Sequence, residues 1–185
     1  MFARSITYRR DDMVRSITAA LLGGALILLP PTHLSAQTAL SVAGGISAPV
    51  SDLGDVADMG YNLGVALNFG GTRLPIGARI EGSLNGFGLK DFDESLRIAS
   101  GTANAIVNFS QKADSPYLIG GIGIYNSKLR DFDSDNAVGV NLGGGLRFPI
   151  GELSTFLELR YHSTLSDNGR SGRLQYIPIT FGVMF

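Results

Sequence analysis

The feature that most constrains this fold is an alternation of apolar and polar residues that recurs in eight separate segments after residue 37. Residues 61–69, for example, read Tyr-Asn-Leu-Gly-Val-Ala-Leu-Asn-Phe. Successive side chains of a β-strand point to opposite faces, so each segment predicts a strand with one apolar and one polar face. The segments lie at 40–47, 61–69, 76–85, 102–109, 116–126, 138–148, 157–162 and 176–185. Residues 116–126 are rich in Gly and Ile, and which of them share a face stays open.

The structure that such strands form depends on whether their apolar faces contact lipid or another sheet of the same protein. A soluble sandwich buries its apolar face against a second sheet, whereas a membrane barrel turns that face to lipid and keeps polar residues in its lumen. The polar face here carries charges of both signs, which suits a small lumen. We therefore predict an all-β, eight-stranded antiparallel up-and-down transmembrane β-barrel over residues 37–185. A soluble lipocalin-like barrel would need its apolar face inside.

The N-terminus predicts an export signal. Arg15 precedes an apolar run at 17–29, which ends at two prolines and is followed by the small residue Ala36. The run is shorter than the roughly 20 residues that a transmembrane helix requires. Residues 1–36 are therefore predicted to be a secretory signal peptide that is removed, with translation starting at Met1 or Met13.

The predicted connections alternate in length. Those at 70–74, 110–115 and 149–153 are short, and those at 50–59, 86–96, 127–136 and 166–173 are longer and more acidic. Short periplasmic turns and longer extracellular loops are typical of outer-membrane barrels, and an even strand count puts both termini in the periplasm.

Composition excludes several classes of function. The chain has no cysteine, which removes disulfides, thiolate metal sites and a catalytic thiol. Its formal net charge is -1 and it has no basic stripe, so nucleic acid is not an expected partner. The loop carboxylates Asp91, Asp93, Asp131, Asp133 and Asp135 lack the spacing of a calcium loop. No phosphate-binding or zinc motif occurs, so we expect no cofactor and no metal.

The last segment carries a more specific signal. It places five apolar residues on one face and ends in an aromatic: Ile177, Ile179, Phe181, Val183 and Phe185. This pattern resembles the C-terminal signal of outer-membrane barrels, and the region from residue 37 resembles the eight-stranded outer-membrane β-barrel domain family of the OmpA-transmembrane, OmpX and OmpW type. The resemblance implies a monomer in the cell outer membrane of a Gram-negative bacterium. It also implies contact with outer-membrane lipid and lipopolysaccharide, and with periplasmic chaperones and the barrel-assembly machinery during biogenesis.

Charged residues mark the inner face of the predicted barrel. Alternation places them in the lumen: Arg79, Glu81, Arg147, Glu158 and Arg160. A buried charge must be paired or solvated, so we interpret them as an ion-pair network that fills the lumen. The alternative is a narrow, porin-like channel for ions or small apolar molecules that these residues gate. The inward glycines Gly64, Gly143 and Gly145 are expected to make room for larger neighbours.

A catalytic interpretation rests on His162. The segment 158–164 faintly resembles the His-x-Ser strand of outer-membrane lipid A deacylases, in which the histidine is the base and the serine the nucleophile. Here Ser163 is adjacent to the histidine, and neighbours on a strand point to opposite faces. We therefore predict a non-enzymatic protein of envelope structure or surface interaction, and keep a lipid A-modifying enzyme as the less favoured alternative.

Overall fold

The computed structural model describes residues 38–70, 75–90, 95–110, 112, 114–129, 134–165 and 173–185. The predicted signal peptide and four of the loop carboxylates, at 91, 93, 131 and 133, lie outside these residues. Among the described residues, no helix is long and apolar enough to cross a membrane.

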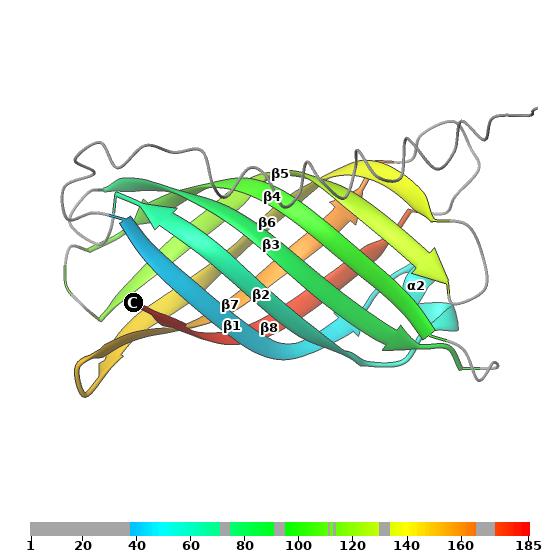
Figure 1. Ribbon diagram of the computed structural model, residues 1–185, viewed down its shortest axis with the longest axis horizontal. Coiled ribbons are helices and arrows are strands. Elements are labelled where there is room, and N and C mark those ends of the chain that lie inside the picture. Colours follow the sequence, from blue (N-terminus) through cyan, green and yellow to red (C-terminus); the bar gives the residue numbers. More distant parts are fainter. Residues whose placement is uncertain are drawn as a thin grey trace, which may run out of the picture. The chain divides into compact units, whose positions relative to one another are not determined.

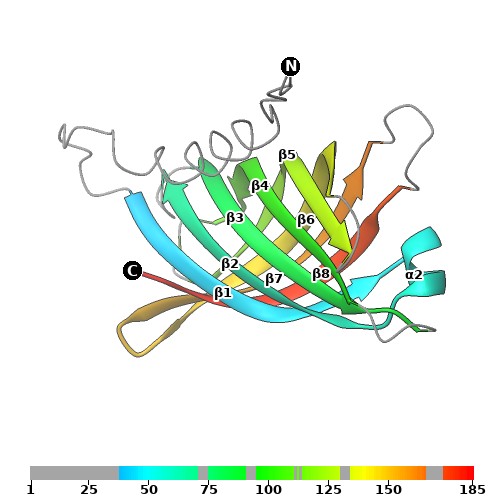
Figure 2. The same ribbon diagram turned by 45° about the vertical axis from the view of Figure 1, so that its right-hand side comes forward.

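Eight strands form one closed antiparallel barrel in the order β1 to β8, which confirms the predicted fold (Figure 1, Figure 2). Closure comes from β1, which pairs with both β2 and β8. The strands are β1 (Thr38–Pro49), β2 (Gly60–Phe69), β3 (Ile76–Gly88), β4 (Ser95–Asn108), β5 (Ser115–Leu129), β6 (Asp135–Ile150), β7 (Leu153–Thr164) and β8 (Gln175–Met184). Because every strand has two partners, the sheet exposes no unpaired edge to lipid.

The outer surface is apolar and the inner surface is mixed. Leu63, Ile122 and Leu142 point outward and are 56%, 65% and 66% exposed. Exposed side chains of this kind recur at alternate positions along the strands and form an apolar belt that needs an apolar solvent. The structure also shows which residues of β5 share a face: Tyr117 and Ile119 are buried inside the barrel, and Leu118 faces outward.

Two of the connections differ from prediction. The segments 86–96 and 127–136 were expected to be long loops, but β3 and β4 continue until only 89–94 separates them, and β5 and β6 leave only 130–134. The additional strand residues Phe87, Leu96 and Ile98 are fully buried and pack together inside the barrel. That packing stabilises strand structure where the lack of alternation had indicated loops.

A short helix packs at one end of the barrel. Helix α2 (Asp52–Val56) lies in the β1–β2 connection, at the end of the barrel opposite the C-terminus (Figure 1). Leu53 and Ala57 are only 4% and 2% exposed because they pack on the inward aromatic residues of the strands. A bridge from Ala57 to Leu89 joins this segment to the β3–β4 hairpin. The connection therefore folds inward and covers part of the loop-side mouth.

One inward glycine makes room for a larger lumen side chain, as predicted, because a Cβ at Gly145 would lie 2.5 Å from the Tyr117 ring. At Gly143 a Cβ would instead collide with the β7 backbone, at the Leu159 carbonyl and 2.6 Å from Arg160 Cα. The prediction was wrong for Gly64, where a Cβ would lie 3.7 Å from Ser83 in ordinary contact. Glycine on β6 thus allows the backbone to approach residues that fill the lumen.

Candidate functional site

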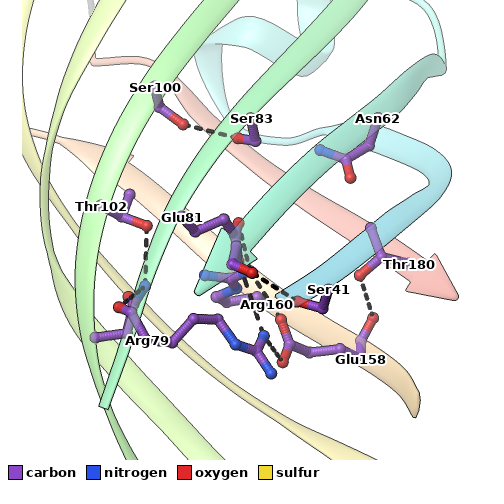
Figure 3. Close-up of polar contacts among 12 residues, drawn as sticks. Ser41, Asn62, Arg79, Glu81, Ser83, Ser100, Thr102, Glu158, Arg160 and Thr180 are labelled. Atoms are coloured by element: carbon purple, nitrogen blue, oxygen red, sulfur yellow. Dashed lines mark hydrogen bonds and ion pairs between the residues drawn. The ribbon is translucent and has the colours of Figure 1, made fainter. Parts of the chain in front are cut away.

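Four charged side chains meet across the middle of the lumen (Figure 3). Strand β3 supplies Arg79 and Glu81, and β7 supplies Glu158 and Arg160. Spacing by two residues puts both members of each pair on the inner face of their strand. In a closed barrel of eight strands, β3 and β7 lie four strands apart in either direction, so these side chains reach across from opposite walls.

The four groups form a closed ring of opposite charges, which we call the cross-lumen cluster. Arg79 Nη1 lies 2.8 Å from Glu158 Oε2, and Arg160 Nη2 lies 2.8 Å from Glu158 Oε1. Arg160 Nη2 is also 2.8 Å from both oxygens of Glu81, and Arg79 Nη1 is 3.8 Å from Glu81 Oε2. Two positive and two negative charges therefore balance, and each one contacts two of opposite sign.

Burial makes this balance necessary. The side chains of Arg79 and Glu158 are 1% exposed, and removing an ion from water costs several kcal/mol unless partners replace its solvation. Neutral side chains also form hydrogen bonds with the charged groups of the cluster. Arg79 Nε donates to Asn68 Oδ1 at 2.7 Å, and the Tyr117 hydroxyl donates to Glu158 Oε2 at 2.6 Å. Hydrogen bonds from neighbouring strands therefore stabilise the cluster in addition to the attraction between its own charges.

Arg147 occupies a different place from the other four residues. It faces the lumen near the C-terminal end of β6, but it forms no ion pair with any described residue, in contrast to the predicted network. Its Nη1 donates to Asn108 Oδ1 at 2.6 Å, and its guanidinium carbon lies 4.6 Å from the centre of the Tyr117 ring. The strand register explains the separation, since Arg147 pairs with Phe156 of β7, below Glu158 and Arg160.

Apolar layers lie on both sides of the cross-lumen cluster. The layer nearer the C-terminus, the end expected to face the periplasm, is called the periplasmic-side layer and consists of Ile106, Tyr117, Ile119 and Phe156. The loop-side layer consists of Leu53, Ala57, Phe87, Leu96, Ile98, Tyr125 and Tyr176. The alternation pattern gave no sign of these layers, because the residues sit on the face that carries polar side chains elsewhere in the same strands.

His162 packs against the loop-side layer, through Tyr125 and Tyr176. It is 2% exposed, its Nδ1 lies 3.0 Å from the Tyr125 hydroxyl, and its ring stacks on Tyr176 at 4.9 Å between centres. Ser163, the next residue, donates to the Thr164 carbonyl at 3.5 Å. In the described part of the chain no hydrogen bond joins His162 to Ser163, so the geometry forms no nucleophile–base pair.

The terminal strand completes the barrel wall. Ile179 and Phe181 are 38% and 44% exposed on the outer face, and Phe185 is 68% exposed beyond the end of β8. Phe185 and Leu40 exchange both backbone hydrogen bonds, which extends the closing β1–β8 contact by one pair. The role of Ile177, Ile179, Phe181, Val183 and Phe185 as an assembly signal stays a prediction. Within the described residues, no three His, Asp or Glu side chains gather where they could hold a metal ion.

Comparison with known proteins supports the fold. No family model and no curated protein sequence matches the chain. Neisserial surface protein A (NspA) is 14% identical and covers 80% of this chain and 95% of its own, with a TM-score of 0.65. The outer membrane enzyme PagL is 15% identical over 80% of this chain and 98% of its own, with a TM-score of 0.55. Ail, the attachment invasion locus protein of Yersinia pestis, is 18% identical over 82% and 100%, with a TM-score of 0.51.

At these identities the likeness concerns the fold. The chain has the fold of the eight-stranded outer-membrane β-barrels, as predicted. Together with the apolar belt, this fold makes the protein a small integral barrel of the outer membrane. These neighbours include an outer membrane enzyme and an attachment invasion locus protein, so the fold alone does not determine the function of this chain.

Proposed function

We propose that this protein is a non-enzymatic outer-membrane barrel with a closed lumen, which stabilises the envelope or presents its extracellular loops for surface interaction. The observation that supports this most strongly is the cross-lumen cluster, whose ion pairs join opposite walls at 2.8 Å. Apolar layers above and below the cluster, and the cover formed by α2, would each have to move before an ion could pass. A lumen built in this way stiffens the barrel and leaves the loops as the surface for partners.

The small space beside the cluster argues against a channel. A cavity of about 10 Å³ lies among Ser41, Asn62, Glu81, Glu158 and Thr180. A cavity of that size holds about one water molecule. An ion crossing the barrel would need a continuous file of water, which this space does not offer.

The proposal gives His162 a packing role. The neighbouring barrel PagL is an enzyme, so a catalytic site is the natural alternative. In this chain, however, the imidazole is bonded to Tyr125, stacked on Tyr176 and covered by the loop-side layer. A lipid substrate could not reach it without displacing that layer.

The proposed partners follow from the surface. The apolar belt would contact lipid and the acyl chains of lipopolysaccharide, and the terminal strand would be read by the barrel-assembly machinery after delivery by periplasmic chaperones. We further propose a monomer, because closure within one chain leaves no strand edge for a second copy.

Single-channel recording tests the closed lumen. We expect the protein, reconstituted in planar bilayers, to give no discrete openings, because the cluster and both apolar layers block the path. Arg160→Gln is expected to be equally silent, and heat-modifiable gel mobility would show that both proteins are folded. Discrete openings whose conductance changes in Arg160→Gln would overturn the proposal and make the cluster the gate of a narrow channel.

A further inference from the structure

The periplasmic mouth of the barrel contains a cavity that has no part in closing the lumen. It has a volume of about 200 Å³, and its apolar walls include Phe69, Ile106, Met184 and Phe185. Ile106 is 2% exposed and lies deep, whereas Phe185 is 68% exposed and lies at the rim. An apolar cavity of roughly 150 Å³ is large enough to hold a benzene-sized molecule. The space is therefore sufficient for a segment of an acyl chain.

A buried cation lines the same cavity. Arg147 is 4% exposed, belongs to the cavity wall and has no carboxylate partner among the described residues. Its Nη1 is used by Asn108, but its Nε is buried and has no hydrogen-bond partner in that part of the chain. The Tyr117 ring covers one face of the guanidinium and leaves its edge for an anion.

Charge balance distinguishes Arg147 from the other lumen arginines. Arg79 and Arg160 are each within 4 Å of two carboxylates, and the cross-lumen cluster is neutral as a whole. Arg147 therefore adds one uncompensated positive charge at the inner end of an apolar cavity. A planar guanidinium with a free Nε matches a carboxylate, which can accept two parallel hydrogen bonds.

We propose that this cavity binds the carboxylate of a single-chain fatty acid, with the head group on Arg147 and the acyl chain along Ile106, Met184 and the rim phenylalanines. Ile106 lines the cavity and also belongs to the periplasmic-side layer, which lies between the cavity and the cross-lumen cluster. The site therefore holds its ligand at the periplasmic face and does not pass it through the barrel. This inference is independent of the surface role proposed above.

The test uses the protein in phosphatidylcholine nanodiscs with decanoate as the probe. Binding is followed through the ¹H–¹⁵N resonance of Arg147 Nε, which is assigned by its loss in Arg147→Lys. We expect decanoate to shift this resonance in a saturable way. Arg147→Gln lacks the Nε group, so its binding is followed through the carboxyl resonance of ¹³C-carboxyl decanoate and is expected to be about tenfold or more weaker. Ser154→Phe fills the cavity while keeping the arginine, so it is expected to abolish the shift even if Arg147→Gln does not fold.

Matched controls separate this site from general partitioning into the membrane. Arg97→Gln removes an exposed arginine and is expected to leave binding unchanged. Decanol, which has the same chain without the charge, is expected to bind about tenfold or more weakly than decanoate. Equal binding of decanol, or an unchanged response in Ser154→Phe, would overturn the proposal. A shift caused by phosphatidylglycerol nanodiscs without decanoate would also overturn it, in favour of a phospholipid head group.

Discussion

Glu158→Gln is expected to lower the free energy of unfolding by about 3–5 kcal/mol, the usual cost of removing one partner from a buried ion pair. Glu158 is 1% exposed and contacts both arginines of the cross-lumen cluster as well as the Tyr117 hydroxyl. Its loss leaves two buried guanidinium groups with Glu81 as their only carboxylate partner among the described residues. The measurement is urea unfolding of the barrel in lipid vesicles, followed by circular dichroism and gel mobility.

Two further variants make this result specific. Glu152→Gln changes an exposed carboxylate in the β6–β7 turn and is expected to stay within about 0.5 kcal/mol of the unmodified protein. The double variant Arg79→Met with Glu158→Met removes a balanced pair and is expected to recover much of the lost stability, because apolar groups of similar volume can replace a buried ion pair. A Glu158→Gln protein as stable as Glu152→Gln would contradict the structural role of the cluster.

The second large effect concerns the apolar belt. Leu142→Arg is expected to lower the free energy of unfolding from the bilayer by about 2–4 kcal/mol, the cost of a cation at the midplane of the lipid-facing surface. Leu142 is 66% exposed and lies near the middle of β6, so most of its side chain faces lipid. The same vesicle-based unfolding assay measures the change.

Ile150→Arg is the matched control for depth. Ile150 lies on the same face at the periplasmic end of β6 and is 52% exposed. The cost there is expected to fall to about 0–1 kcal/mol, because an arginine near the interface reaches water. Equal costs at the two positions would mean that the exposed face of β6 is not immersed in lipid.

Alternation predicted most of the wall and missed what fills the lumen. It works where one face is apolar and the other polar, as in β2 and β7. It left β5 open because Leu118 faces outward while Ile119 faces inward, and both are apolar. The start of β4 was missed for the same reason, because Leu96 and Ile98 are apolar but point inward. Packing inside the lumen can stabilise apolar side chains, just as contact with lipid does on the outer face.

The site could be predicted only in part, because alternation gives the face of a residue but not its partner. It indicated correctly that Arg79 and Glu158 point inward, whereas their contact depends on closure, which brings β3 opposite β7 across 79 residues of sequence. The separate position of Arg147 depends on the register of β6 against β7, which no local pattern encodes. Helix α2 is too short for its periodicity to be visible.

Thiol accessibility tests the closed lumen most directly, because the chain contains no cysteine and each introduced thiol is unique. Thr102→Cys and Ser47→Cys place thiols at inward positions that are 4% and 0% exposed, and Ser134→Cys places one in an exposed connection. We expect an aqueous methanethiosulfonate to modify Ser134→Cys rapidly in the folded, membrane-inserted protein. The two lumen thiols are expected to react only after unfolding in urea. Modification of Thr102→Cys in the folded barrel at the rate of Ser134→Cys would mean a water-filled lumen and would contradict the closed lumen proposed for this protein.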